Sequence, residues 1–280
     1  MFFRLDDEDG ERWGDMIPAM WRIDRLRLQS VAKAFFVSAM SIGFAMAASA
    51  QSAGKMSRVP FVGCASDGQV GPVDAPTGPS PELEIPLNLA QRLAYYRAQY
   101  GFGVLAPRGW RCFSTYGSNG SSLYVTPEAV DAAELFSSDW RGFAGSAIQV
   151  SVSEGDTSGR FEVAKVIARV FPAEQQFVRN VIAEGIEPAS SFPSGPYAQD
   201  KLTYRGQRTV EFETPPEVQG LGTQSRLLAN PEPIRGVAIL FGEEPNLVLI
   251  SARLPKADRD LAPIIIQQVE NDVRGAKNHD

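Results

Sequence analysis

Residues 20–50 have the pattern of a cleavable secretory signal, and this feature constrains the rest of the chain more than any other. The apolar run over 34–47 is about 14 residues long, whereas a helix that spans a bilayer needs roughly 20. Ala48-Ser49-Ala50 has the small side chains of a cleavage site. The run follows a basic stretch that contains Arg22, Arg25, Arg27 and Lys33. We therefore expect cleavage near Ala50 and a periplasmic or secreted mature chain without a stable membrane span.

Residues 1–19 do not fit this signal, because they are rich in acidic side chains where a signal begins with basic ones. We interpret them as a wrongly assigned start, with Met20 or Met16 as the first residue. The alternative is a genuine acidic tail ahead of an uncleaved anchor. A lipid anchor on Cys64, after Phe61-Val62-Gly63, is disfavoured because charged residues and a proline separate it from the apolar run.

The chain has two cysteines, Cys64 and Cys112, and both follow the predicted signal. In an oxidising compartment two such cysteines pair, and closing this loop would stabilise the fold by about 4 kcal/mol on the chain-entropy model. A reactive thiol is the alternative, but the only histidine, His279, is the penultimate residue of the chain. We therefore predict a disulfide between Cys64 and Cys112.

The charge balance argues against a nucleic acid or an anionic membrane surface as partner. The chain carries 27 Lys and Arg against 33 Asp and Glu, and 6 and 7 of these precede residue 51, which leaves a net charge of −5 after it. Either partner would favour a basic face. The length after residue 50 suits one domain of moderate size that can bury a core.

The N-terminal half of the mature chain reads as an arm followed by a helix and a hairpin. Residues 51–87 are rich in proline and glycine and predict an extended arm. Leu89, Leu93, Tyr96 and Tyr100 recur at helical spacing between Asn88 and Gly101, which predicts a helix. A strand is expected at 103–107. Strands at 110–115 and 122–126 flank Asn119-Gly120, a strong hairpin signal.

The C-terminal half predicts an alternation of strands and helices. A short helix is possible at 128–136, strand 147–153 alternates cleanly, and two helices follow between 160 and 184. The remaining expected elements are a hairpin at 202–213, strands at 236–241 and 246–254, and a helix over 260–274 that ends before a tail at 276–280. We predict a single α+β domain at 88–275, an antiparallel sheet flanked by helices.

The sequence lacks the residues that most catalytic mechanisms require. A single histidine near the terminus excludes Ser-His-Asp and Cys-His catalysis and histidine-ligated zinc, and we expect no metal, no cofactor and no assigned catalytic residue. A carboxylate pair leaves no local signature, so Asp131, Glu134 and Asp139 stay as candidates. A Ser–Lys dyad would use Lys165 or Lys201. These carboxylates and lysines are also what a solvated surface would carry.

Residues 108–122 form the best candidate binding surface. Aromatic and arginine side chains combined with small polar residues are a composition that binding surfaces favour. The simpler alternative is that Trp110 belongs to the core and the rest is an ordinary hairpin tip. The candidate residues are Arg108, Trp110, Arg111, Tyr116 and Asn119.

The order of elements resembles the Mog1/PsbP-type α/β/α sandwich. Val104-Leu105-Ala106-Pro107-Arg108-Gly109-Trp110 is similar to the opening strand and Pro-x-Gly-Trp turn of that fold. The strand at 147–153 followed by a helix, the hairpin 236–254 and the final helix 260–274 extend the resemblance over residues 103–274. It implies the sandwich architecture and, because members of that fold are mostly non-catalytic, a binding or assembly role.

The sequence therefore favours an exported envelope protein that binds or assembles without covalent chemistry. Its expected partner is an envelope protein or polymer. One alternative is a carboxylate- or Ser/Lys-dependent hydrolase of envelope polymers, which two carboxylates facing each other in an open cleft would favour. The other alternative is a purely structural envelope component.

Overall fold

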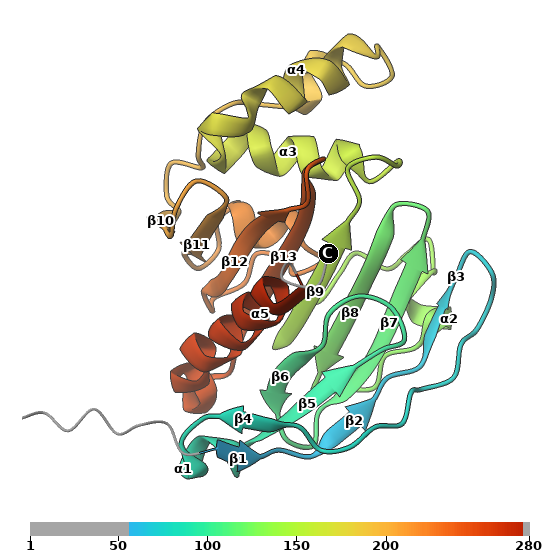
Figure 1. Ribbon diagram of the computed structural model, residues 1–280, viewed down its shortest axis with the longest axis vertical. Coiled ribbons are helices and arrows are strands. Elements are labelled where there is room, and N and C mark those ends of the chain that lie inside the picture. The colour runs from blue at the N-terminus through green and yellow to red at the C-terminus, as the bar shows by residue number, and fades with distance from the viewer. Residues whose placement is uncertain (1–55, 277–280) are drawn as a thin grey trace, which may run out of the picture. The chain divides into compact units, whose positions relative to one another are not determined.

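The computed structural model describes residues 56–276 (Figure 1). These residues lie within one compact unit. The predicted signal segment, the alternative starts and His279 lie outside the described residues. Between residues 56 and 276, no helix combines the length and the apolar character needed to cross a membrane.

The main sheet has eight strands, and all neighbours pair antiparallel except β3, which runs parallel to β7. The central part of this sheet contains the hairpins and the strand at 147–153 that the sequence predicts. From edge to edge the strands are β10 (Lys201–Tyr204), β11 (Thr209–Thr214), β12 (Ile234–Phe241), β13 (Asn246–Arg253), β9 (Ala147–Ser153), β8 (Gly120–Thr126), β7 (Arg111–Gly117) and β3 (Ser66–Gly68).

Two smaller sheets use the segment predicted as an arm. A three-stranded sheet consists of β2 (Phe61–Gly63), β5 (Leu93–Arg97) and β6 (Val104–Pro107), and β1 (Met56–Arg58) pairs with β4 (Glu82–Glu84). The residues before 88 are extended, as expected, and they also contribute a strand or more to each of the three sheets. This segment is therefore bonded to the domain along much of its described length.

Helices complete a mixed α and β fold, which confirms the broad fold prediction. The two long helices predicted between 160 and 184 and the C-terminal helix are all present. The α-helices are α1 (Leu87–Ala90), α2 (Ala132–Leu135), α3 (Arg160–Val170), α4 (Gln175–Ala183) and α5 (Ala262–Ala276). Short 3₁₀ turns occur at Pro172–Glu174, Ala189–Ser191, Leu221–Gln224 and Lys256–Leu261.

The two faces of the main sheet support separate cores. Successive side chains of a strand point to opposite faces, and Val248 and Ile250 of β13 pack with α5 and the three-stranded sheet. Their neighbours Leu247 and Leu249 pack instead with α3 and α4. We call these the α5 face and the α3 face. Figure 1 shows α5 crossing one side of the sheet and the α3–α4 pair above its end.

The predicted disulfide is confirmed. Cys64 lies between β2 and β3 and bonds to Cys112 of β7, with the two Cα atoms 5.3 Å apart. Cys64 itself is buried in the core on the α5 face. The bond therefore joins the N-terminal strands to the main sheet.

The helix predicted at 88–100 is wrong. Only α1 is helical there, and Leu93–Arg97 form β5, which pairs with β2 and β6. Leu93, Ala94, Tyr95 and Tyr96 are all buried, so this strand is covered on both faces. A strand buried on both faces has a continuous apolar run instead of alternation, and periodicity does not distinguish it from a helix. Hydrogen bonding to β2 and β6 on either side stabilises the strand conformation of this segment over a helix.

The β7–β8 hairpin forms around the predicted turn, but the loop residues are Ser118 and Asn119, because Gly117 already pairs with Gly120. Gly120 has a φ of 124°, which disfavours any other residue. A Cβ atom there would also lie 1.9 Å from the carbonyl oxygen of Val152 on β9. The glycine thus allows β8 and β9 to pair close to the turn.

Candidate functional site

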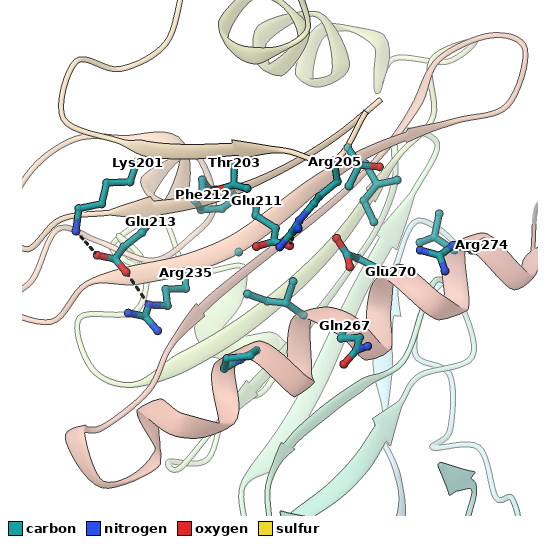
Figure 2. Close-up of a pocket in the computed structure, with 16 residues that line it drawn as sticks. Lys201, Thr203, Arg205, Glu211, Phe212, Glu213, Arg235, Gln267, Glu270 and Arg274 are labelled. Carbon is teal, nitrogen blue, oxygen red and sulfur yellow. Dashed lines mark hydrogen bonds and ion pairs between the residues drawn. The ribbon is translucent and has the colours of Figure 1, made fainter. Parts of the chain in front are cut away.

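Each face of the main sheet is covered over only part of its width, and the uncovered parts form two grooves. The charged groove lies on the α5 face, between β10–β11 and α5, and has a volume of about 740 Å³ (Figure 2). The serine groove lies on the α3 face over β8 and β9, with a volume of about 560 Å³. Both volumes are in the range of ligand sites, roughly 300–1,000 Å³.

The sheet side of the charged groove carries a ladder of ion pairs. Glu213 accepts hydrogen bonds from Lys201 of β10 at 2.9 Å and from Arg235 of β12 at 2.8 Å. One step along the strands, Arg205 donates to Glu211 at 2.9 Å. The three basic side chains are 45–76% exposed. Solvent therefore screens these ion pairs, and each stabilises the fold by at most about 1 kcal/mol.

The alternation of β11 explains why the ladder faces the groove. Val210 and Phe212 are buried against α3 and α4, so Thr209, Glu211 and Glu213 point to the opposite face. Antiparallel pairing then sets Lys201 opposite Glu213 and Thr203 opposite Glu211. Because α5 packs mainly on β12 and β13, these charged side chains remain accessible in the groove.

Glu270 forms the other wall, projecting from α5 toward Glu211 and Arg205 (Figure 2). One of its carboxylate oxygens is buried and has no hydrogen-bond partner among the described residues. Burial raises the pKa of Glu270, and the nearby charge of Glu211 raises it further, while Arg205 and Arg274 act in the opposite direction. The groove thus contains one carboxylate whose bonding capacity is unused.

Apolar side chains line the groove between these charges. Ile239 of β12 and Ile266 and Val273 of α5 contribute to its surface, and all three also belong to the core on the α5 face. A ligand in the groove would therefore contact aliphatic surface beside carboxylates and bases. This combination suits the methylene stem and charged end of a lysine or arginine side chain.

The structure separates the predicted binding surface 108–122 into two groups. At one end of β7, Arg108 donates to the carbonyl of Ala90 at 3.2 Å, Trp110 packs on the core of the α5 face, and Arg111 is exposed. At the other end, Tyr116 donates to the carbonyl of Gly71 at 2.6 Å, and Asn119 lies in the hairpin loop. Only this second group reaches a groove, the serine groove.

The other candidate residues do not gather into one site. Asp131 caps α2 by accepting a hydrogen bond from the backbone of Glu134 at 3.0 Å, and Asp139 is exposed nearby. Lys165 pairs with Glu162 on its own helix and with Glu187. Lys201 does line the charged groove, where it pairs with Glu213 and not with a serine.

Glu211 and Glu270, which lie 59 positions apart, were not predicted from the sequence. A signal for each exists in the pattern: Glu211 is at an outward position of an alternating strand, and Glu270 follows Ile266 by four residues on a helix. Neither pattern predicts that the two elements are neighbours. That juxtaposition depends on the sheet order.

No cluster of three or more His, Cys, Asp or Glu side chains suited to a metal ion occurs within residues 56–276. In comparisons with known proteins, no family model, no curated protein and no solved structure gives a significant match to this chain. What the charged groove does is therefore inferred from its own geometry.

Proposed function

We propose that this chain is an exported binding or assembly factor of the cell envelope, without covalent chemistry, whose charged groove holds an extended peptide segment through a basic side chain. The disulfide supports the export part of this proposal, because disulfides persist in oxidising compartments. The Mog1/PsbP-like architecture belongs to the same proposal, since helices flank both faces of a mostly antiparallel sheet.

The observation that carries the binding function is the unpartnered carboxylate of Glu270. A buried carboxylate oxygen without a donor costs roughly 1–3 kcal/mol, so a ligand that supplies a donor recovers this energy. Glu211 faces the same space, and two carboxylates together favour a cationic donor over a neutral one. A lysine ammonium or an arginine guanidinium has this chemistry.

The remaining surface of the groove fits the rest of such a peptide. The stem of the basic side chain would lie on Ile266 and Val273, which border Glu270 on α5. Backbone and acidic groups of the peptide would face Arg235 and Lys201 along the ladder. The groove has charges of both signs, so it selects a segment of mixed charge instead of a polycation.

The test measures binding of the purified chain to three capped pentapeptides, Gly-Ser-Lys-Ser-Gly, its arginine analogue and its glutamine analogue, by isothermal titration calorimetry. We expect the basic peptides to bind and Glu270→Gln to weaken them at least about tenfold, the loss of a charge-assisted hydrogen bond. Glu243→Gln, an exposed turn variant outside the groove, is the matched control and should bind like the parent chain. Equal binding of the glutamine peptide would contradict the proposal.

A carboxylate-dependent hydrolase is the second candidate, and the facing of Glu211 and Glu270 favours it. Glu270, with its raised pKa, would serve as the proton donor, and Glu211, held by Arg205, as the base or nucleophile. The two functions differ in one measurement. A hydrolase releases soluble fragments from purified peptidoglycan and loses this activity in Glu270→Gln, whereas a binding factor releases none.

A further inference from the structure

We propose that the serine groove is a second binding site, which takes a neutral saccharide. The groove lies on the face of the sheet opposite the charged groove and shares no lining residue with it. Three features support this site: a floor of uncharged hydroxyl and amide groups, a hydrogen-bond network that fixes them, and an aromatic rim. None of them depends on the function proposed for the charged groove.

The floor of the groove is polar but has no charge. Strands β8 and β9 contain no Asp, Glu, Lys or Arg over their full lengths. On the α3 face, antiparallel pairing sets Ser122 opposite Ser151 and Tyr124 opposite Gln149. Solvent-facing strands normally carry charged side chains, so a floor built only from hydroxyl and amide groups indicates selection of a neutral, hydrogen-bonding ligand.

A connected network holds these groups in place. The amide nitrogen of Gln149 donates to Ser151 at 2.7 Å, and the hydroxyl oxygens of Ser151 and Ser122 lie 2.8 Å apart. The amide oxygen of Gln149 accepts from the backbone of Arg226 at 2.7 Å, which fixes the orientation of the amide. Gln149 is only 6% exposed, so the network is anchored beneath the groove. Each serine hydroxyl retains capacity to donate or accept toward a ligand.

Three of the residues that line the groove are aromatic, Tyr116, Tyr124 and Phe136. Tyr124 packs on Phe143, with ring centroids 5.5 Å apart, and on Trp140 at 6.4 Å. Phe136 lines the rim and is 58% exposed, an unusual position for so large an apolar side chain. An aromatic ring beside fixed hydroxyl groups offers a flat apolar surface for the C–H face of a sugar ring and partners for its hydroxyl groups.

The charged residues that line the groove are already engaged. Glu162 of α3 accepts from Lys165 at 2.9 Å, and the guanidinium of Arg226 lies over the Trp140 ring. With one acidic and one basic side chain among its lining residues, the groove offers no net charge to an ionic ligand. Charge complementarity therefore favours a neutral saccharide over a phosphate, a nucleotide or an acidic glycan.

The test titrates the purified chain with chitotetraose, cellotetraose and maltotetraose, with tetragalacturonic acid as the charged comparison, and follows heat and tryptophan fluorescence. At least one neutral tetrasaccharide should bind, with an affinity that changes less than about twofold between 50 and 500 mM salt. Phe136→Ala should weaken binding by about threefold to tenfold. The double variant S122A/S151A should weaken it further.

Two control variants establish whether a bound saccharide occupies the serine groove. Ile186→Ala removes a similarly exposed apolar side chain outside the groove, and Glu270→Gln alters only the charged groove, so neither should change saccharide binding. Circular dichroism of Phe136→Ala, whose side chain is at the surface, verifies folding. The inference is overturned if no neutral tetrasaccharide binds, if Phe136→Ala binds like the parent chain, or if tetragalacturonic acid binds more tightly than all three.

Discussion

The charged groove and the serine groove are the uncovered parts of one sheet, on opposite faces and toward opposite ends, and their chemistry differs sharply. The strands of the first carry lysine, arginine and glutamate at their outward positions, while those of the second carry serine, glutamine and tyrosine. Where α5 or the α3–α4 pair covers a strand, the same alternating positions are leucine, valine and isoleucine. A strand position that lies under a helix must therefore be apolar, whereas a position that no helix covers can carry a polar side chain that binds a ligand.

The two grooves also differ in how firmly the fold holds them. The ladder of the charged groove consists of exposed ion pairs on an edge hairpin, whereas loops pinned by a buried side chain support the serine groove. Arg253 of β13 is 1% exposed and donates to the carbonyl oxygens of Gly145, Phe143 and Leu228. The Phe143 segment in turn pairs with the Arg226 segment, whose backbone amide fixes Gln149.

The largest expected effect comes from removing this buried guanidinium. Arg253→Met leaves the carbonyl oxygens of Gly145 and Leu228 without a donor and takes one of two donors from that of Phe143, so it should lower the free energy of unfolding by about 3–6 kcal/mol, measured by urea titration. Arg235→Met, on the neighbouring strand in the charged groove, is the matched control and should cost less than about 1 kcal/mol. Similar losses in the two variants would break the contrast between the grooves.

Loss of the disulfide should rank next. The double variant C64S/C112S is expected to lower the free energy of unfolding by roughly 2–4 kcal/mol, because the bond closes a loop with a sequence separation of 48. Neither groove includes these cysteines, so ligand affinities should stay unchanged under conditions where the variant is folded. A change in affinity at either groove would show that the N-terminal strands shape it.

Two glutamates of the charged groove should respond to pH with opposite signs. Burial raises the pKa of Glu270, so its stabilising contribution is present at low pH and is lost as pH rises through the raised pKa. Glu270→Gln should therefore melt at a higher temperature than the parent chain at pH 7 and at about the same temperature at pH 4. Because Glu270 is only half-buried and the charges of Arg205 and Arg274 offset part of this shift, the expected difference is small, about 1 kcal/mol.

Glu213→Gln provides the reverse case. Hydrogen bonds from Lys201, together with the nearby Arg235, lower the pKa of Glu213, so its contribution is present above its ordinary pKa and is lost as pH falls through the lowered value. This variant should melt below the parent chain at pH 7, and the difference should shrink as pH falls below the ordinary pKa of a glutamate. Thermal melts across this range measure both variants, and the same sign at pH 7 would contradict the assignment.

The smallest effect is expected for Lys201→Gln. The lysine side chain is 76% exposed, and an ion pair this exposed contributes from zero to about 1 kcal/mol. Any change in melting temperature should disappear in 1 M salt, which screens exposed charges. A large loss that persists in high salt would indicate that the edge hairpin depends on this pair.

Local patterns predicted those elements whose burial follows a simple period. Strand β9, the hairpins and helices α3, α4 and α5 bury one face or stripe each, so their sequences alternate or repeat as the structure requires. The disulfide was predictable because the chain has only two cysteines. Segment 93–97 was not, since it is buried on both faces and its apolar run fits a helix equally well.

The candidate sites were much less predictable than the elements. Gln149 and Arg226 are 77 positions apart, and Glu211 and Glu270 come from a strand and a helix with no local relation. Of the five residues predicted as a surface, Tyr116 and Asn119 border the serine groove, and Arg108, Trp110 and Arg111 lie at the other end of β7. These residues are close in sequence, but they lie at the two ends of β7. A seven-residue strand separates its ends by about 20 Å, so they cannot form one site.

The sequence by itself determined which strands alternate, that helices form at α3, α4 and α5, and that two cysteines pair, because each depends on neighbours in the chain or on composition. Only the tertiary structure decided which outward positions stay uncovered. The order of strands in the sheet sets where α5 and the α3–α4 pair lie, and their finite width leaves one part of each face open. An exposed glutamate or serine in a strand has the same local pattern whether it faces bulk solvent or a groove, so its role follows from what the fold sets across from it.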